Sequence, residues 1–141
     1  MWTYEHSLDT TATTERIWQL YSDVRTWPSW DQANEYTTLD GPFRAGSRGT
    51  MKFTGQDPLP FTLVAVAPGR YFADETDLGD IVIRFEHRLH AGAGKTTITT
   101  RVTISGPAAD QLGPELGPQV TADVPAQLAA IAALALSGEE R

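Results

Sequence analysis

The C-terminal segment 107–136 most constrains what this chain can fold into. Its large apolar residues recur at steps of three or four, the spacing of one helix face, and they are Leu112, Leu116, Val120, Val124, Leu128, Ile131 and Leu134. Alanine, the strongest helix former, fills most of the gaps. A helix with such an apolar stripe must lie on another apolar surface. We therefore expect one long helix that ends near Ser137 and Gly138, followed by a frayed end at 139–141.

Proline interrupts this segment. Pro125 lacks a backbone donor and crowds the preceding turn, so the helix should bend near Pro125 or begin there. The stretch 112–118 contains Pro114, Gly117 and Pro118 and should be less regular than the rest.

Two short helices are expected near the start of the chain. Thr13 or Thr14 can cap the first helix, which should end before Trp27. Pro28 suits the first turn of a second helix, which should reach about Ala33.

Most of the remaining chain has the pattern of strands. Residues 2–9 alternate between apolar and polar side chains. Turn signals at intervals of roughly ten residues then separate six further segments, which are 36–39, 49–54, 61–66, 71–77, 81–90 and 96–105. The pattern predicts an antiparallel meander, with a hairpin formed by the last two strands.

Length and charge narrow the possible functions. The 141 residues suffice for one domain with a core, so we expect a single domain over 1–141. A net charge of −7 argues against binding to nucleic acid or anionic lipid. The chain has no Cys and no cluster of His, Asp and Glu, so neither a metal nor another cofactor is expected. The first residues do not have the pattern of a signal peptide, and the apolar run 126–136 is too short to span a bilayer. We therefore expect a cytoplasmic protein without membrane insertion.

Three segments resemble a known family. They are 15–30, with Asp23 followed by Trp27 and Trp30; 72–78 with 84–87; and 101–107, which runs into the last helix. Together with the order of elements, they resemble the SRPBCC superfamily of START-related proteins, and within it the polyketide cyclase/dehydrase branch. Related chains often have His at the position of Thr100, so an imidazole pair is not expected here.

The resemblance implies an α+β helix-grip fold. In that fold a seven-stranded antiparallel sheet wraps around a long C-terminal helix, with two short helices after the first strand. It also implies an apolar cavity between the sheet and the last helix. Known members bind lipids, hormones or polyketides, and some are enzymes.

His87 is the leading candidate for chemistry. It lies on the apolar phase of strand 81–90, where an imidazole could orient a ligand carbonyl or act as a general base. The alternative is a core histidine that a backbone group or a Tyr hydroxyl satisfies. His6 is a weaker candidate of the same kind. His90 faces the opposite side of its strand from His87, so the two cannot chelate one metal.

The acidic strand 71–77 supplies a second candidate. If Phe72, Asp74 and Thr76 face inward, Asp74 is a carboxylate in an apolar cavity, with the raised pKa of a general base. In the opposite phase Glu75 takes that place. The sequence leaves the phase open, and a carboxylate at a hydrated rim is the alternative for both residues.

The cavity should lie between the inner sheet face and the last helix, where alanine side chains leave room. Its expected lining is Met51, Phe53, Phe61, Leu63, Phe72, Phe85, Val102 and Leu128, with Trp30 near the mouth and His87 as the main polar group. Trp27 and Trp30 could form a lid over this cavity or could simply pack the short helices.

We therefore expect a protein that binds a hydrophobic small molecule, lipid- or polyketide-like. The alternative is a cyclase or dehydrase that uses a cavity His or carboxylate as general acid or base. A protein-binding module would need an exposed apolar patch, which the sequence does not indicate. A phosphate loop at 92–97 is excluded because Leu89 stands where its first Gly is required, and no Gly-x-Ser-x-Gly motif is present. The chain could be a monomer or a homodimer.

Overall fold

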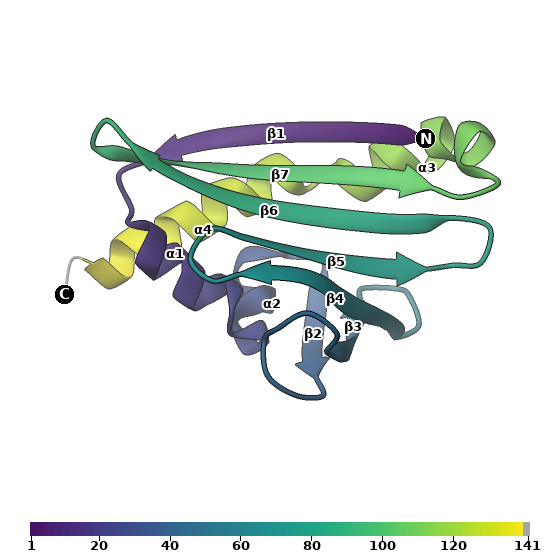
Figure 1. The fold of residues 1–141 in the computed structure, drawn as a ribbon, viewed down its shortest axis with the longest axis horizontal. Coiled ribbons are helices and arrows are strands. Elements are labelled where there is room, and N and C mark those ends of the chain that lie inside the picture. The colour runs from purple at the N-terminus through teal and green to yellow at the C-terminus, as the bar shows by residue number, and fades with distance from the viewer. Residues whose placement is uncertain (140–141) are drawn as a thin grey trace.

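A curved antiparallel sheet forms one layer of the molecule (Figure 1). In the computed structural model, which describes residues 1–139, the sheet has seven strands: β1 (Trp2–Thr10), β2 (Asn34–Leu39), β3 (Arg48–Phe53), β4 (Leu59–Ala67), β5 (Tyr71–Asp77), β6 (Val82–Gly92) and β7 (Lys95–Ser105). Their order is β1-β7-β6-β5-β4-β3-β2, so the first strand pairs with the last. The antiparallel seven-stranded sheet predicted from the sequence is confirmed.

The β6–β7 hairpin illustrates how local sequence sets this register. Val82 pairs with Ser105, and the pairing continues without a break to Gly92 and Lys95. The two turn residues, Ala93 and Gly94, have φ angles of 53° and 77°. Positive φ at both central residues matches the twist of the turn to that of the flanking strands. The predicted hairpin is confirmed, and at the turn it extends two residues beyond the first predicted strand and one residue before the second.

Three short helical segments follow β1. They are α1 (Thr14–Tyr21), the 3₁₀ turn η1 (Val24–Thr26) and α2 (Trp27–Trp30). Thr13 caps α1 as expected, because its hydroxyl accepts a hydrogen bond from the backbone N–H of Arg16. The α2 helix ends earlier than predicted, because Asp31 is already extended and its carboxylate accepts a hydrogen bond from the backbone N–H of Ala33.

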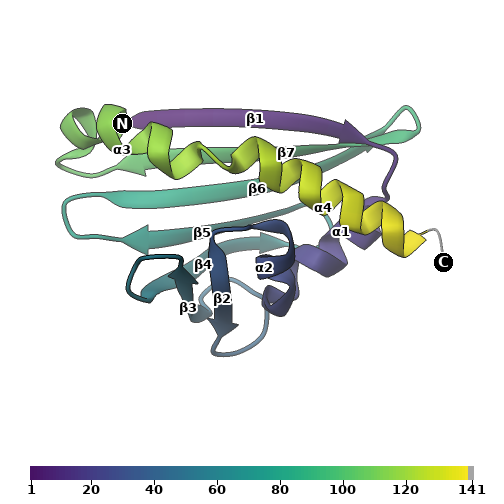
Figure 2. The ribbon, with the colours of Figure 1, turned by 180° about the vertical axis from the view of Figure 1, so that it is seen from behind.

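The C-terminal region forms two helices rather than one. The α3 helix (Ala109–Thr121) and α4 (Val124–Glu139) are separated at 122–123, and Figure 2 shows them crossing the sheet one after the other. The predicted bend is confirmed: it lies directly before Pro125, which is the second residue of α4. A proline suits that position because the first N–H groups of a helix have no intrahelical partner.

One finer expectation for this region was wrong. The stretch 112–118 is helical throughout, although Pro114 and Pro118 lie inside α3. Gly113 and Gly117 let the α3 backbone lie directly on the Trp2 side chain, and this packing holds the helix in place. The α4 helix ends at Glu139, close to the predicted end near Ser137 and Gly138, and Gly138 lies against the Arg16 guanidinium. Of the predicted frayed end at 139–141, residue 139 is the last residue of α4, and 140–141 lie outside the described residues.

The core lies between the sheet face that carries the helices and the helices themselves. Both α3 and α4 contact β1 and β7, and α4 also contacts α1 and α2. By length and composition 109–138 could cross a membrane. In this structure the segment is broken at 122–123, and Val124, Leu128 and Ile131 of α4 are completely buried in the core. That is the arrangement of a core helix in a soluble-type fold.

Candidate functional site

A cavity of about 260 Å³ opens at the break between α3 and α4. On one side are β3, β5 and β6 of the sheet, and on the other are α2, the start of β2 and the helix break itself. Its walls are mostly aromatic and aliphatic side chains, which are Trp27, Trp30, Met51, Phe53, Leu59, Leu78, Ile83, Phe85 and Val120. The structure therefore combines an apolar pocket with an interruption in the helix that covers it.

Half of the predicted lining meets at this cavity. Trp30, Met51, Phe53, Phe85 and His87 border it. Trp30 is itself buried, so its place is in the wall rather than at an exposed mouth. Trp27 and Trp30 both line the cavity and pack against each other, with ring centroids 5.8 Å apart.

The other predicted residues fill the core beside the cavity and do not border it; they are Phe61, Leu63, Phe72, Val102 and Leu128. Phe61 and Phe72 pack on Trp27, at ring-centroid distances of 6.0 and 5.9 Å. The four strand residues face the helices, as predicted, and Leu128 lies on α4 itself. Trp18 of α1 and Trp27 of α2 both pack on Phe72. Facing inward was therefore not enough to place a side chain at the cavity.

Alanine on the last helix does not create the space. Ala132 is buried away from the cavity, and Ala129 and Ala133 are exposed. Within the described part of α4, Gln127 alone borders the cavity. The residues of this region that border the cavity lie on both sides of the break at 122–123, and they are Gln119, Val120, Asp123 and Gln127.

His87 is a buried, neutral imidazole. Its Nδ1 atom lies 3.4 Å from the Thr100 hydroxyl, and its ring stacks on Phe72 with centroids 4.4 Å apart. Burial lowers the pKa of His87 to about 3, so the ring is uncharged at neutral pH. The Tyr21 ring lies 5.1 Å away. Burial raises the pKa of the Tyr21 hydroxyl, and the nearby Thr100 opposes that change. His87 thus borders the cavity while being held by core side chains.

The burial pattern of β5 shows which of its two faces points inward. Phe72, Asp74 and Thr76 face the helices and are buried, and Asp74 is only 3% exposed. Burial raises the pKa of Asp74 to about 7, with Glu75 acting in the same direction and Arg84 opposing both. Asp74 also borders the cavity. The expectation of a hydrated rim carboxylate was wrong for this residue.

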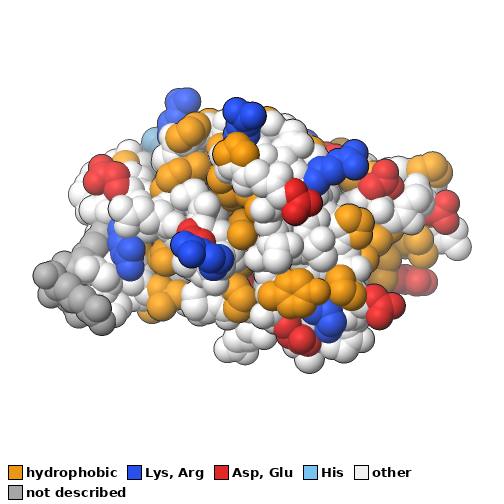
Figure 3. Space-filling model, turned by 90° about the horizontal axis from the view of Figure 1, so that it is seen from below, with side chains coloured by type: hydrophobic (Ala, Val, Ile, Leu, Met, Phe, Trp, Pro, Cys, Tyr) orange, Lys and Arg blue, Asp and Glu red, His pale blue; other side chains and the backbone are white. Residues whose placement is uncertain are grey.

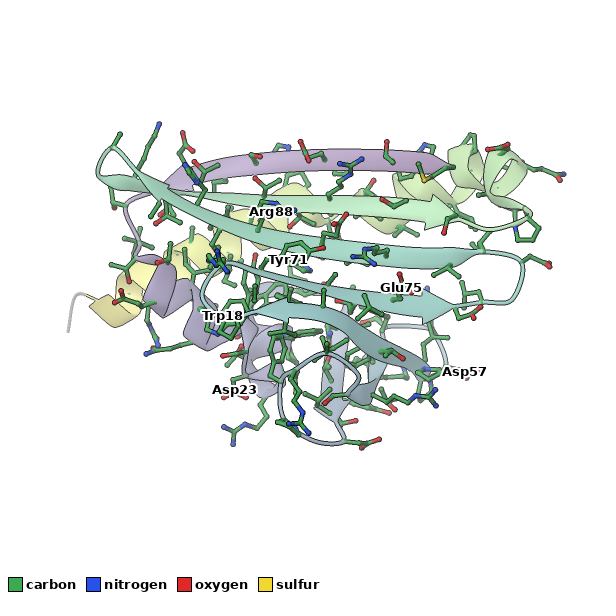
Figure 4. The ribbon with its side chains drawn as sticks, in the orientation of Figure 1. Trp18, Asp23, Asp57, Tyr71, Glu75 and Arg88 are labelled. Carbon is green, nitrogen blue, oxygen red and sulfur yellow. The ribbon has the colours of Figure 1, made fainter. Side chains whose placement is uncertain are left out.

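Glu75 belongs to the opposite face of the sheet. Figure 4 shows it on the outer side, together with Tyr71 and Arg88. Its carboxylate pairs with Arg84 at 3.1 Å, and the guanidinium of Arg84 also donates to the Tyr71 hydroxyl at 3.2 Å. Glu75 is thereby excluded as the cavity carboxylate.

The cavity lining includes polar groups without a protein partner. In the described chain five buried side-chain atoms have no hydrogen bond, and three of them belong to residues that border the cavity. These three are Trp30 Nε1, Asn34 Oδ1 and Asp74 Oδ1. A buried polar group without a partner costs roughly 1–3 kcal/mol. The concentration of such groups around one space suggests that a polar part of a ligand belongs there.

A second acidic group borders the cavity near the helix break. The pKa of Asp31 is raised by burial; the Ala33 backbone N–H and the Gln127 side chain lower it, and Asp123 raises it again. Sequence reasoning missed Asp31, Asn34 and Asp123, because no periodicity marks residues in a loop or a helix break. A sequence signal could have found Thr76, which shares the phase of Asp74, and Ile83, which shares the apolar phase of Phe85 and His87.

The remaining candidates lie elsewhere. His6 pairs with Thr100 across β1 and β7, and His90 faces outward near the β6–β7 turn. In residues 1–139 no group of three or more His, Asp and Glu side chains is placed to hold a metal ion. On the face seen in Figure 3, hydrophobic side chains lie interspersed with polar and charged ones.

Comparison with known proteins identifies the family. A family model described as polyketide cyclase/dehydrase and lipid transport matches residues 1–135. The chain belongs to this family. The match confirms the resemblance drawn from the sequence. No curated protein matches the chain.

Solved structures of low sequence identity share the fold. Norcoclaurine synthase from Thalictrum flavum is 16% identical, with a TM-score of 0.72 over 95% of this chain and 86% of that one. The di-domain ARO/CYC protein StfQ of the steffimycin biosynthetic pathway is 13% identical, with a TM-score of 0.78 over 99% of this chain and 52% of StfQ. Protein Ms6760 from Mycobacterium smegmatis is 22% identical, with a TM-score of 0.67 over 96% and 92%. Together these similarities establish the helix-grip fold of this family member.

Proposed function

We propose that this protein binds a hydrophobic small molecule, lipid- or polyketide-like, in the cavity at the α3–α4 break. The observation that carries the proposal is a space of about 260 Å³ with mainly apolar walls. Pockets for drug-sized ligands measure roughly 300–1,000 Å³, so a body of one or two rings suits this one. Membership of a family described by polyketide cyclisation and lipid transport supports the same function.

Apolar burial would supply most of the affinity. Each Å² of apolar surface removed from water contributes about 25 cal/mol before the costs of association. The neutral His87 ring can accept or donate one hydrogen bond, according to its tautomer, and so orient a polar group on the ligand. We propose that Trp30, Met51, Phe53 and Phe85 hold the apolar body.

A cavity-filling variant tests this proposal. Thr76 is buried and borders the cavity, so Thr76→Phe should occupy the space and weaken binding of neutral 2-naphthalenemethanol at least tenfold by calorimetry. Thr103 lies on the outer face of the neighbouring sheet region, so Thr103→Phe is the matched control and should bind as the parent does. Circular dichroism checks that both variants fold. The proposal fails if folded Thr76→Phe binds the probe with unchanged affinity.

A second candidate is a cyclase- or dehydrase-type enzyme. The observation that favours it is that Asp74 and His87 border the same cavity, and a carboxyl with a pKa of about 7 suits general acid–base catalysis near neutral pH. His87, with a pKa of about 3, is too weakly basic for that role and would act as a neutral hydrogen-bonding group.

The variant His87→Ala distinguishes the two candidates. In a binding protein it should weaken a polar-headed ligand by roughly 1 kcal/mol, the scale of one hydrogen bond. In an enzyme, where the neutral ring would stabilise the transition state through that hydrogen bond, it should lower turnover of a polyketide-like substrate by about a hundredfold while binding persists. Calorimetry and product analysis on the same variant measure both quantities.

A further inference from the structure

The ionisable Asp, Lys and Arg side chains that line the cavity are all acidic. The acidic side chains on its lining are Asp31, Asp74 and Asp123, and none of the described Lys or Arg residues borders it. The positive charge that lowers the pKa of Asp74 belongs to Arg84. This residue lies on the outer sheet face, where it pairs with Glu75. An anionic ligand would therefore meet three carboxyl groups without a compensating cation.

The unpartnered atoms favour a hydrogen-bond donor on the ligand. Two of the three, Asn34 Oδ1 and Asp74 Oδ1, are oxygens that can accept a hydrogen bond, and both side chains are more than nine-tenths buried. The third, Trp30 Nε1, is a donor on an aromatic ring that also borders the cavity. An ammonium group satisfies carboxylate and amide oxygens together, and an aromatic face attracts a cation.

We propose that the ligand of this cavity is an apolar amine, whose ammonium group binds Asp74 and Asn34 while its ring body lies between the apolar walls. This inference rests on the proposed ligand-binding function and specifies its ligand class. An ammonium beside Asp74 supplies the counter-charge that the cavity lacks. A hydroxyl would supply a hydrogen bond without that charge, and a carboxylate would add a fourth acidic group.

The ionisation of Asp74 makes the proposal measurable. Glu75 and Arg84 face it from the outer side of β5 and β6, His87 lies on the same inner face, and Asp31 lines the same cavity. At pH 6 most of the Asp74 carboxyl is protonated and must lose its proton to pair with an ammonium. Affinity for an amine should therefore rise about fivefold to tenfold from pH 6 to pH 8, whereas affinity for a neutral alcohol should stay nearly constant.

Calorimetric titration of the full chain with three naphthalene probes tests the inference. The probes are 2-naphthylmethylamine, 2-naphthalenemethanol and 2-naphthoate, which share one ring system. We expect the amine to bind at least tenfold more tightly than the alcohol at pH 8, and the carboxylate to bind more weakly than either. Asp74→Asn should weaken the amine about tenfold, abolish its pH dependence and leave the alcohol within threefold. Asp40→Asn, at an exposed loop position, should change none of these values.

The outcomes separate this inference from the proposed function. If the alcohol binds and the amine binds no more tightly, the ligand-class inference is overturned while ligand binding stands. Equal binding of the carboxylate, or an unchanged amine affinity in Asp74→Asn, overturns it as well. If none of the three probes binds, the ligand-binding proposal fails and this inference fails with it. If Asp74→Asn does not fold, the order of the three probe affinities and the pH dependence of amine binding, both measured on the parent protein, still test the inference.

Discussion

Replacing Asp74 with Asn should remove a pH-dependent loss of stability. The pKa of Asp74 is about 7 in the folded protein, against an ordinary value of 3.8. Because the folded pKa is raised, the stability linked to this group is fully present below pH 3.8 and is lost as the pH rises through 7. Each pH unit in that interval is worth about 1.4 kcal/mol, so the full span is worth roughly 4 kcal/mol. An amide cannot ionise and avoids this loss.

Urea denaturation of the parent and of Asp74→Asn at pH 4.5, 6 and 8 measures the effect. The variant should gain in unfolding free energy relative to the parent as the pH rises, by roughly 3–4 kcal/mol over this range. Carboxylates with lowered pKa values, such as Asp9 and Asp23, are present in both proteins and cancel in the difference. Asp40→Asn provides the exposed control. If the difference in unfolding free energy between the parent and Asp74→Asn stays constant with pH, Asp74 is not a buried carboxyl with a raised pKa.

Three further changes test the packing of the C-terminal helices by chemical denaturation. Gly117→Ala should destabilise the fold by about 1–3 kcal/mol, because a Cβ there overlaps the Trp2 ring; helix propensity alone predicts a gain of about 1 kcal/mol, so a stabilised variant would contradict the contact. Leu128→Ala should cost about 2–5 kcal/mol because the side chain is fully buried, and a cost below about 1 kcal/mol would be inconsistent with that burial. Pro125→Ala should cost less than about 1 kcal/mol, since residue 125 lies in the first turn of α4, where a proline breaks no helical hydrogen bond; a cost above about 2 kcal/mol would contradict that position.

The sequence by itself determined the order of elements and most of their boundaries. Alternation over 81–90 and 96–105 placed His87 on the inner face, where it lies in the structure. A proline after an apolar helical repeat predicted the break near Pro125. These features follow from side-chain periods of two or 3.6 residues and from the backbone chemistry of proline. Both are local properties, set by residues that are close together in the sequence.

The location of the cavity was decided by tertiary structure. The inner phase of β5 depends on its pairing with β4 and β6, and this pairing buries Asp74 instead of Glu75. Asp31 and Asn34 carry no periodic signal and border the cavity only because α2 lies beside the break between α3 and α4. Inward-facing Phe72 is covered by Trp27, while inward-facing Phe85 borders open space. Periodicity says which way a side chain faces, but whether it meets another side chain or a cavity depends on where separate elements come together in space.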